Sequence, residues 1–208
     1  MAMNENSRVT VTGLVASGAE FSHDMFGEQF YEFKIAVPRE SGVVDILPVM
    51  VSERVCDIDV LNIDAMIEVN GQLRTRNVHI GEKTKLDLTI FAENVDLMPF
   101  GGLLGTNNIV LDGYICKSTN YRKTPFGREV CDILLAVNRP YGKSSYIPCI
   151  AWGRTARYSG NLRIGQHIKI TGRFQSREYN KVLEDGNSET RTAYEVSVFK
   201  LEVLEDAE

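Results

Sequence analysis

The chain contains an internal repeat of about one hundred residues, which restricts its fold more than any other feature. Comparing residue n with residue n+100 gives matches in consistent order: Gly13 with Gly113, Phe26-Gly27 with Phe126-Gly127, Ala36-Val37 with Ala136-Val137, Arg39 with Arg139, and Pro48 with Pro148. Residues 70–76 match residues 171–177 at an offset of 101, and Phe91 matches Phe199 at an offset of 108. The difference predicts seven additional residues (108 − 101) in the second copy, within a polar loop at 180–192. We therefore expect two copies of one domain, at 1–98 and 106–208.

Both copies have the sequence pattern of short β-strands separated by turns. Stretches rich in Val, Ile, Thr and aromatic residues lie at 8–15, 29–37, 45–51, 65–73 and 85–91. Helical periodicity is confined to two short candidates, at 52–60 and 154–162. About five strands, with a short helix between the third and the fourth, is the order of elements in an OB-fold. We therefore predict an all-β chain of two tandem OB-folds, each a Greek-key barrel of about five strands.

Composition and motifs argue against several classes of protein. No apolar run is long enough to cross a bilayer, and residues 1–8 lack the apolar core of a signal peptide, so we expect a cytoplasmic protein without membrane contact. The four cysteines have no CxxC spacing and are interpreted as small buried thiols. The sequence has no P-loop, GxGxxG, HExxH or GxSxG motif. We therefore expect no enzyme, no catalytic residues, no metal site and no cofactor.

Charge is distributed unequally between the two copies. The net charge is −5, but residues 1–104 carry 8 basic and 16 acidic residues, whereas residues 105–208 carry 15 basic and 12 acidic residues. A basic half is suited to a polyanionic partner. The acidic first copy is expected to serve structure or assembly, unless Arg74 and Arg76 contribute to binding at its edge.

The second copy also combines aromatic residues with cations. In a strand over 144–152, alternation places Tyr146 and Trp152 on one face and small apolar residues on the other. Single-stranded nucleic acid suits such a surface, because bases stack on rings while Lys and Arg follow the phosphates. The candidate nucleic-acid-binding residues are Tyr146, Trp152, Tyr179, Tyr141, Arg122, Lys123, Arg128, Lys143, Arg173, Arg177, Lys181 and Arg191. The four aromatic positions align with Ser41, Ile46, Ser52 and Val78 in the first copy, so the fold itself does not require aromatic residues there.

Several segments resemble the bacterial single-stranded DNA-binding protein family. They are residues 107–113, 146–154, 164–166 and 171–179, and, in the first copy, 70–76. The resemblance implies base stacking by Tyr146, Trp152 and Tyr179, with Tyr141 as an additional candidate. It also implies a homodimer of this chain that presents four OB-folds. The chain stops at residues 204–208 without the family's long acidic tail, in which respect it is also similar to primosomal replication protein N.

These observations favour a non-catalytic protein that binds single-stranded DNA without sequence preference, in replication, repair or recombination. The alternative is a protein-interaction module of a primosome or replication complex, in which Ile46 and Met50 of the first copy would contact the partner. An oligosaccharide-binding OB-fold is a more remote option, since it would not need the basic residues. The sequence leaves the choice between DNA and RNA open, because no residue can be assigned to a 2′-hydroxyl.

Overall fold

The computed structural model describes residues 6–80, 83–99, 101, 105–182 and 186–205, without the side chains of 77–80, 83–85 and 182. The first half contains β1 (Ser7–Val15), β2 (Glu20–Met25), β3 (Glu28–Pro38), β4 (Val44–Ser52), η1 (Ile58–Val60), β5 (Met66–Ile80) and β6 (Lys83–Leu97). The second contains β7 (Asn107–Ile115), β8 (Asn120–Lys123), β9 (Glu129–Arg139), η2 (Pro140–Gly142), β10 (Lys143–Trp152), α1 (Gly153–Ser159), β11 (His167–Val182) and β12 (Ser188–Val203). None of the helices in these ranges has the length and hydropathy needed to cross a membrane.

Each half closes into a small barrel with the same strand connections. In the first, β3 pairs with β4, β4 with β6, β6 with β5, β5 with β1, and β1 returns to β3. The pairing of β4 with β6 is parallel, whereas the other pairings are antiparallel. The second half repeats this circuit with β7, β9, β10, β12 and β11. This is the connectivity of an OB-fold, so the prediction of an all-β chain with two tandem OB-folds is confirmed.

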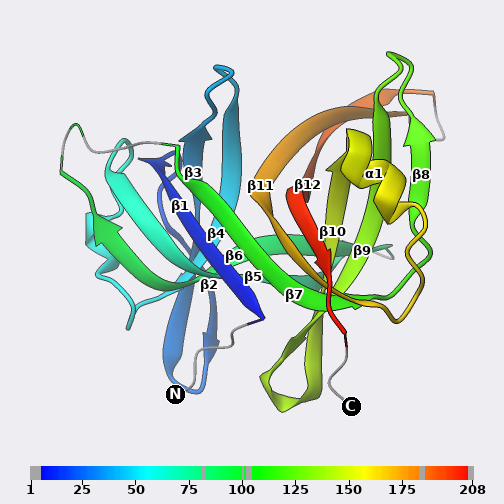
Figure 1. Cartoon of the computed structure of the whole chain (residues 1–208). Coiled ribbons are helices and arrows are strands. Elements are labelled where there is room, and N and C mark those ends of the chain that lie inside the picture. The colour runs from blue at the N-terminus through cyan, green and yellow to red at the C-terminus, as the bar shows by residue number, and fades with distance from the viewer. Residues whose placement is uncertain (1–5, 81–82, 100, 102–104, 183–185, 206–208) are drawn as a thin grey trace.

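The two barrels are joined by a pair of strands that are distant in sequence. Strands β1 and β7 run antiparallel and pair from Ser7 with Leu111 to Val11 with Asn107. Figure 1 shows these strands, in blue and green, side by side across the centre of the molecule. Twelve strands therefore belong to one continuous hydrogen-bonded sheet.

Of the two predicted helices, one forms and the other does not. The second candidate forms α1, which buries Ala156 and Ser159 against its barrel. The first candidate was wrong for most of its length, because only the single turn η1 forms there. The side chain of Asp57 accepts a hydrogen bond from the backbone N–H of Asp59, and Asn62 Nδ2 donates to the carbonyl of Asp59 at 3.0 Å. These local bonds begin and end the turn before a second turn can form.

Strand pairing corrects the alignment of the last strand in each repeat. Ile90 lies beside Val49 in the first barrel, and Val196 lies beside Cys149 in the second, which gives an offset of 106 (196 − 90). The expected offset of 108 was wrong, and the structural counterpart of Phe91 is Ser197. The second copy therefore has five additional residues (106 − 101) here.

The predicted polar loop at 180–192 was also largely wrong. Strands β11 and β12 continue through most of it, with Asn180 opposite Thr190 and Lys181 opposite Glu189. Both faces of this two-stranded ribbon are exposed, so its sequence lacks the apolar alternation that identifies a half-buried strand.

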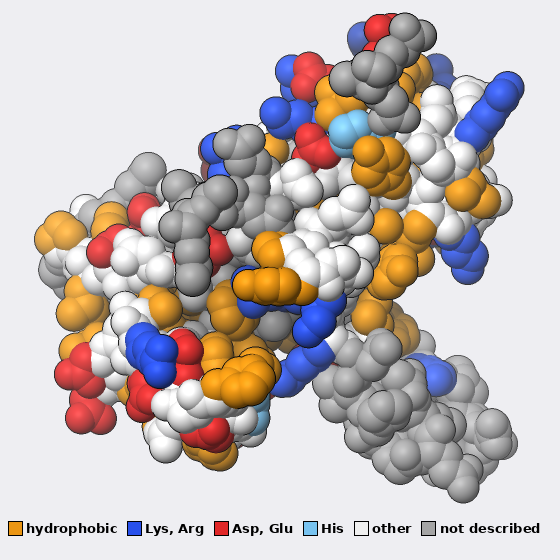
Figure 2. Space-filling view, turned by 90° about the horizontal axis from the view of Figure 1, so that it is seen from below, with side chains coloured by type: hydrophobic (Ala, Val, Ile, Leu, Met, Phe, Trp, Pro, Cys, Tyr) orange, Lys and Arg blue, Asp and Glu red, His pale blue; other side chains and the backbone are white. Residues whose placement is uncertain are grey.

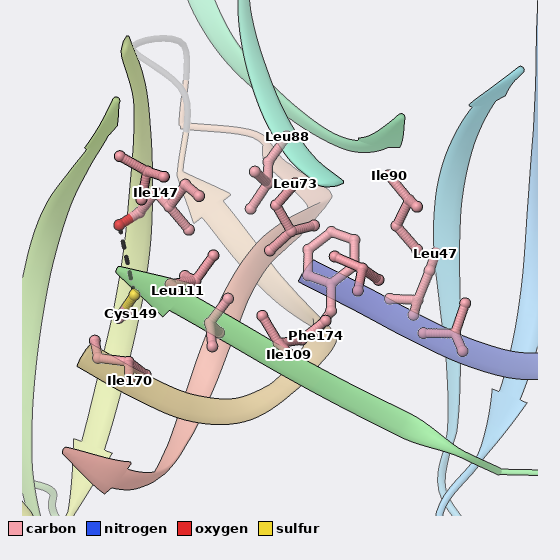
Figure 3. Close-up of a cluster of buried hydrophobic side chains, with 14 of the residues drawn as sticks. Leu47, Leu73, Leu88, Ile90, Ile109, Leu111, Ile147, Cys149, Ile170 and Phe174 are labelled. Carbon is pink, nitrogen blue, oxygen red and sulfur yellow. Dashed lines mark hydrogen bonds between the residues drawn. The ribbon is translucent and has the colours of Figure 1, made fainter. Parts of the chain in front are cut away.

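One hydrophobic core runs through both barrels. Figure 3 shows Leu47, Leu73 and Ile90 from the first barrel near Ile109 and Phe174 from the second. The repeated glycine allows the strands that close each barrel to approach closely. A Cβ at Gly13, on β1, would lie 2.3 Å from the carbonyl oxygen of Ala36 on β3. All four cysteines are free thiols that are partly or fully buried, as predicted.

Candidate nucleic-acid interface

An open groove with a volume of about 1340 Å³ crosses the second barrel and reaches the first. Its walls come from β10, β12, the β8–β9 hairpin, β11 and the start of β4. Five of the candidate binding residues line it: Arg122, Arg128, Trp152, Arg173 and Arg177. A smaller hollow of about 470 Å³ shares Arg39, Arg173 and Phe199 with the groove and continues it toward the joint between the barrels.

Trp152 lies at the end of β10 with its indole in the groove. The side chain is 38% exposed, and its Nε1 donates a hydrogen bond to Ser197 Oγ at 3.1 Å. The alternation predicted for this strand is confirmed, since Ile147 and Ala151 are fully buried on the opposite face. An indole held at one edge by a hydrogen bond and partly open to solvent offers a face on which a base can stack.

The groove is predominantly cationic. Six basic residues and two acidic residues line it: Lys34, Arg39, Arg122, Arg128, Arg173 and Arg177 against Glu178 and Glu195. Burial lowers the pKa of Arg173, and the neighbouring charge of Arg39 lowers it further. Among the described residues, the Nε of Arg173 is buried without a hydrogen-bond partner. A partly buried guanidinium with an unused donor is suited to a phosphate oxygen.

Some of the groove cations already have partners. Arg122 forms a two-bond pair with Asp132, with Nε–Oδ2 and NH2–Oδ1 distances of 3.0 and 3.1 Å. This pair is exposed and therefore weak, so Arg122 can exchange it for a phosphate at small cost. Arg39 is held by the buried carboxylate of Asp45.

Tyr179 belongs to the long β11–β12 hairpin. It is 38% exposed, and the Cζ of Arg177 lies 5.8 Å from the centre of its ring. Lys181 is exposed farther along the same strand. Arg191 lies directly opposite Tyr179 but pairs with Glu189 at 2.8 Å. The hairpin therefore extends the groove with a ring and a neighbouring cation, while the charge of Arg191 is partly compensated.

Tyr146, Tyr141 and Lys143 do not line the groove. Tyr146 is 46% exposed on β10, and its backbone N–H donates to Thr75 Oγ1 of the first barrel at 3.0 Å. Tyr141 is 96% exposed at the β9–β10 turn with a φ of 63°. Lys143 begins β10, and Lys123 is exposed at the end of β8. The structure thus places some candidate residues in the groove and its hairpin, and Tyr146 where β10 meets β5, while Tyr141, Lys143 and Lys123 lie on exposed turns and strand ends.

Sequence reasoning missed the contribution of the first barrel to the groove. Residues Lys34, Arg39, Val43, Val44 and Ile46 line the wall opposite Trp152. The interpretation of Met50 as an exposed contact residue was wrong, because only 6% of it is exposed. No pattern in the sequence shows that the start of β4 in one barrel contacts β11 of the other, since this follows from how the barrels are joined.

The positions that correspond to the groove in the first barrel carry larger side chains. Val130 and Ser197 line the groove, whereas their counterparts Phe30 and Phe91 pack with ring centres 5.9 Å apart. The guanidinium of Arg74 covers Phe91, with its Cζ 3.5 Å from the ring centre. Comparing the two copies at an offset of 100 residues shows that Val130 replaces Phe30. The sequence comparison could not show that Ser197 replaces Phe91, because it aligned Phe91 with Phe199 instead.

The surface charge follows the division between the barrels. Figure 2 shows acidic side chains gathered on the left, over the first barrel, whereas Lys and Arg predominate in the middle and on the right. Within the described parts of the chain, no group of three or more His, Cys, Asp or Glu side chains is placed to hold a metal ion.

Comparison with known proteins shows what the chain resembles in sequence and in fold. Residues 106–204 match the model of the single-strand binding protein family. This half of the chain is therefore similar to that family. The family that these residues match is one of binding proteins.

Individual single-stranded DNA-binding proteins align with part of the chain. "Single-stranded DNA-binding protein 2" of Listeria innocua is 31% identical over 106 residues, in an alignment that covers 48% of this chain and 64% of that protein. "Single-stranded DNA-binding protein 3" of Streptococcus agalactiae is 38% identical over 80 residues, in an alignment that covers 35% of this chain and 58% of that protein. The chain thus spans less than two thirds of the length of these relatives.

A solved structure matches the whole chain in its fold. A deletion mutant of the single-stranded DNA binding protein from Thermus aquaticus aligns with 100% of this chain and 98% of its own, with a TM-score of 0.76 and 23% identity. The match extends over both barrels, including the first barrel, which lies outside the family match.

Proposed function

We propose that the chain binds single-stranded DNA without sequence preference, in replication, repair or recombination. The observation that carries this proposal is the position of Trp152, partly exposed inside a groove lined by six basic residues. Bases stack on the indole and on Tyr179, while Arg128, Arg173 and Arg177 pair with the phosphates. Each stacked base contributes about 1–3 kcal/mol, and no base edge needs to be read.

The proposal assigns different roles to the two barrels. The second barrel supplies the stacking rings and most of the cations, and the first closes the groove with β4 and supports the assembly. Two such chains would present four OB-folds, and we propose a homodimer as the active form. Tyr146, Tyr141, Lys143, Lys123 and Lys181 extend the contact when the DNA is longer than the groove.

A second candidate function, docking of a primosome or replication protein, is favoured by exposed apolar residues on the first barrel. Phe21, Met25 and Phe26 lie around the β2–β3 turn and are 57, 50 and 98% exposed. Loss of a co-purifying replication protein from a full-length Phe26→Ser variant that still binds DNA would support this function. Retention of the same proteins by both chains would count against it.

Fluorescence titration tests the DNA-binding proposal, because Trp152 is the only tryptophan. Added oligo-dT should quench its emission, and the affinity should fall as salt rises because binding releases counterions. Trp152→Ala should weaken binding by about 1–3 kcal/mol, as expected for one lost stack. Arg191→Ala is the matched control and should have a smaller effect, because Glu189 already pairs with this arginine.

Two outcomes would count against the proposal in different ways. Absence of oligo-dT binding by fluorescence anisotropy at low salt would refute the function. Saturable binding without any change in the emission of Trp152 would remove the indole from the interface.

A further inference from the structure

Besides the pairing of β1 with β7, the barrels contact each other at two equivalent joints. One lies between β4 and β11, and the other between β10 and β5. At one joint, the backbone N–H of Ser176 donates to Asp45 Oδ1 at 2.8 Å, and that of Ile46 donates to Ser176 Oγ at 3.2 Å. At the other, the N–H of Thr75 donates to Ser145 Oγ at 3.2 Å, and that of Tyr146 donates to Thr75 Oγ1 at 3.0 Å. Corresponding residues therefore make corresponding bonds at both joints.

The joints differ at one acidic position. Asp45 is fully buried and binds Arg39 through Nε and Oδ2 at 2.6 Å. The counterpart of Asp45 is Ser145, which has no charge, and the counterpart of Arg39 is Arg139. Arg139 therefore lacks a carboxylate at the position from which Asp45 neutralises Arg39. Its Nε is buried without a hydrogen-bond partner in the described part of the protein.

A second cation lies at the same joint. Arg74 precedes Thr75, whereas its counterpart at the other joint is the neutral Gln175. The Nε of Arg74 is also buried without a partner among the described residues, and its guanidinium lies flat over Phe91. Burial lowers the pKa of Arg74 to about 10, with a further contribution from the nearby charge of Arg139.

The carboxylate that acts on Arg74 already accepts a hydrogen bond from another side chain. Glu93 raises the pKa of Arg74, but its Oε1 accepts a hydrogen bond from Gln72 Nε2 at 2.6 Å. Two neighbouring, partly buried guanidinium groups whose Nε donors have no partner among the described residues favour an anion beside them. Phosphate is the anion that fits, because guanidinium groups bind its oxygens through paired N–H bonds.

We propose that Arg74 and Arg139 form a second phosphate-binding site, separate from the groove. A phosphodiester of a bound single strand would occupy it, with an adjacent base on Tyr146, which is 46% exposed and whose backbone N–H donates to Thr75 Oγ1 at this joint. Lys143 lies opposite Arg139 in the β9–β10 pairing and adds a further cation. This inference rests on the proposed function and extends the DNA path from the groove to the opposite joint.

The sharpest test is Ser145→Asp, which copies the first joint onto the second. The new carboxylate would pair with Arg139 as Asp45 pairs with Arg39, and the N–H of Thr75 would donate to it as that of Ser176 does to Asp45. The affinity for oligo-dT of about 30 nucleotides should fall about 5- to 10-fold, whereas that for about 8 nucleotides should not change. The slope of log affinity against log salt should decrease by about 0.7 for each lost phosphate contact.

Arg139→Gln is the second variant and should give the same selective loss if Ser145→Asp does not fold. Unchanged affinity and salt slope for the long oligonucleotide in a folded variant would overturn the inference and leave the proposed function intact. Failure of the wild-type chain to bind either oligonucleotide would instead refute the proposed function.

Inorganic pyrophosphate distinguishes a free anion from a backbone phosphate at this site. Thermal stabilisation of the wild type by pyrophosphate, absent in Ser145→Asp, would assign the site to free anions as well. No stabilisation together with the selective loss of the long oligonucleotide would assign it to nucleic acid alone. No stabilisation and no selective loss would overturn the site.

Discussion

The indole Nε1 of Trp152 donates a hydrogen bond to Ser197 Oγ at 3.1 Å, across the parallel pair of β10 and β12. The corresponding pair in the first barrel is Ser52 and Phe91. The two barrels thus place their large ring on different strands. A ring on β10 overhangs an open groove, whereas a ring on β6 packs with Phe30 and lies under Arg74. This exchange of a large and a small residue decides which barrel has the groove.

The exchange can be reversed by substitution. The double variant Trp152→Ser with Ser197→Phe should fold, because the same pair exists in the first barrel. It should lose at least one stacking contact and fill the floor of the groove, so affinity for labelled oligo-dT should fall by about 2 kcal/mol or more. Fluorescence anisotropy measures this without tryptophan. Ser188→Phe, on the exposed start of β12, is the control and should bind normally; equal loss in both would contradict the prediction.

The ion pair of Arg39 and Asp45 should contribute to stability. Asp45 is fully buried and Arg39 is 18% exposed, so Asp45→Asn leaves a poorly solvated cation without its partner. We expect the free energy of unfolding in urea to fall by about 3–5 kcal/mol. The double variant Arg39→Gln with Asp45→Asn removes both charges and should recover part of the loss. A double variant less stable than Asp45→Asn alone would show that the unpaired cation is not the cause.

The seam of the second barrel should not tolerate a methyl group at Gly113. An added Cβ would lie 2.5 Å from the carbonyl oxygen of Ala136, so β7 and β9 would have to separate. Gly113→Ala should lower the free energy of unfolding by about 1–3 kcal/mol. Gly18→Ala is the matched control, because no atom lies within 4 Å of its Cβ position. Similar denaturation midpoints for the two variants would refute the packing argument.

Burial of Cys149 should make stability depend on pH in the alkaline range. Burial raises the pKa of this thiol above its ordinary value of 9.0, and the charge of Glu195 adds to the effect. Below pH 9 the thiol of Cys149 keeps its proton in both the folded and the unfolded protein. Above pH 9 only the unfolded protein releases this proton, so the free energy of unfolding falls as pH rises. At pH 10 this one thiol lowers the free energy of unfolding by about 1.4 kcal/mol.

Urea denaturation at pH 8 and pH 10 measures this effect. The alkaline loss should be smaller by the same amount in Cys149→Ala, whose cavity weakens the protein equally at both pH values. An identical pH dependence in the two proteins would show that another group is responsible.

The sequence was sufficient to predict the barrels because each is defined by local patterns. Alternation along 144–152, the repeated Gly13 and Gly113, and the unequal charge of the two halves all depend on neighbouring residues or on counting. The position of Trp152 on the outward face of its strand followed from the same alternation.

The joint between the barrels was decided only in three dimensions. Pairing of β1 with β7 brings Val43, Val44 and Ile46 to the wall of a groove in the other barrel, and it places Arg139 beside Arg74. Sequence alignment compares residues that are equivalent, but it cannot show which residues of one copy face those of the other. The register of β12 was fixed by hydrogen bonds to β10 and β11, and only that register identifies Ser197 as the partner of Trp152. Composition and periodicity therefore determined the two barrels, whereas contacts between distant strands determined the shape and charge of the surface between them.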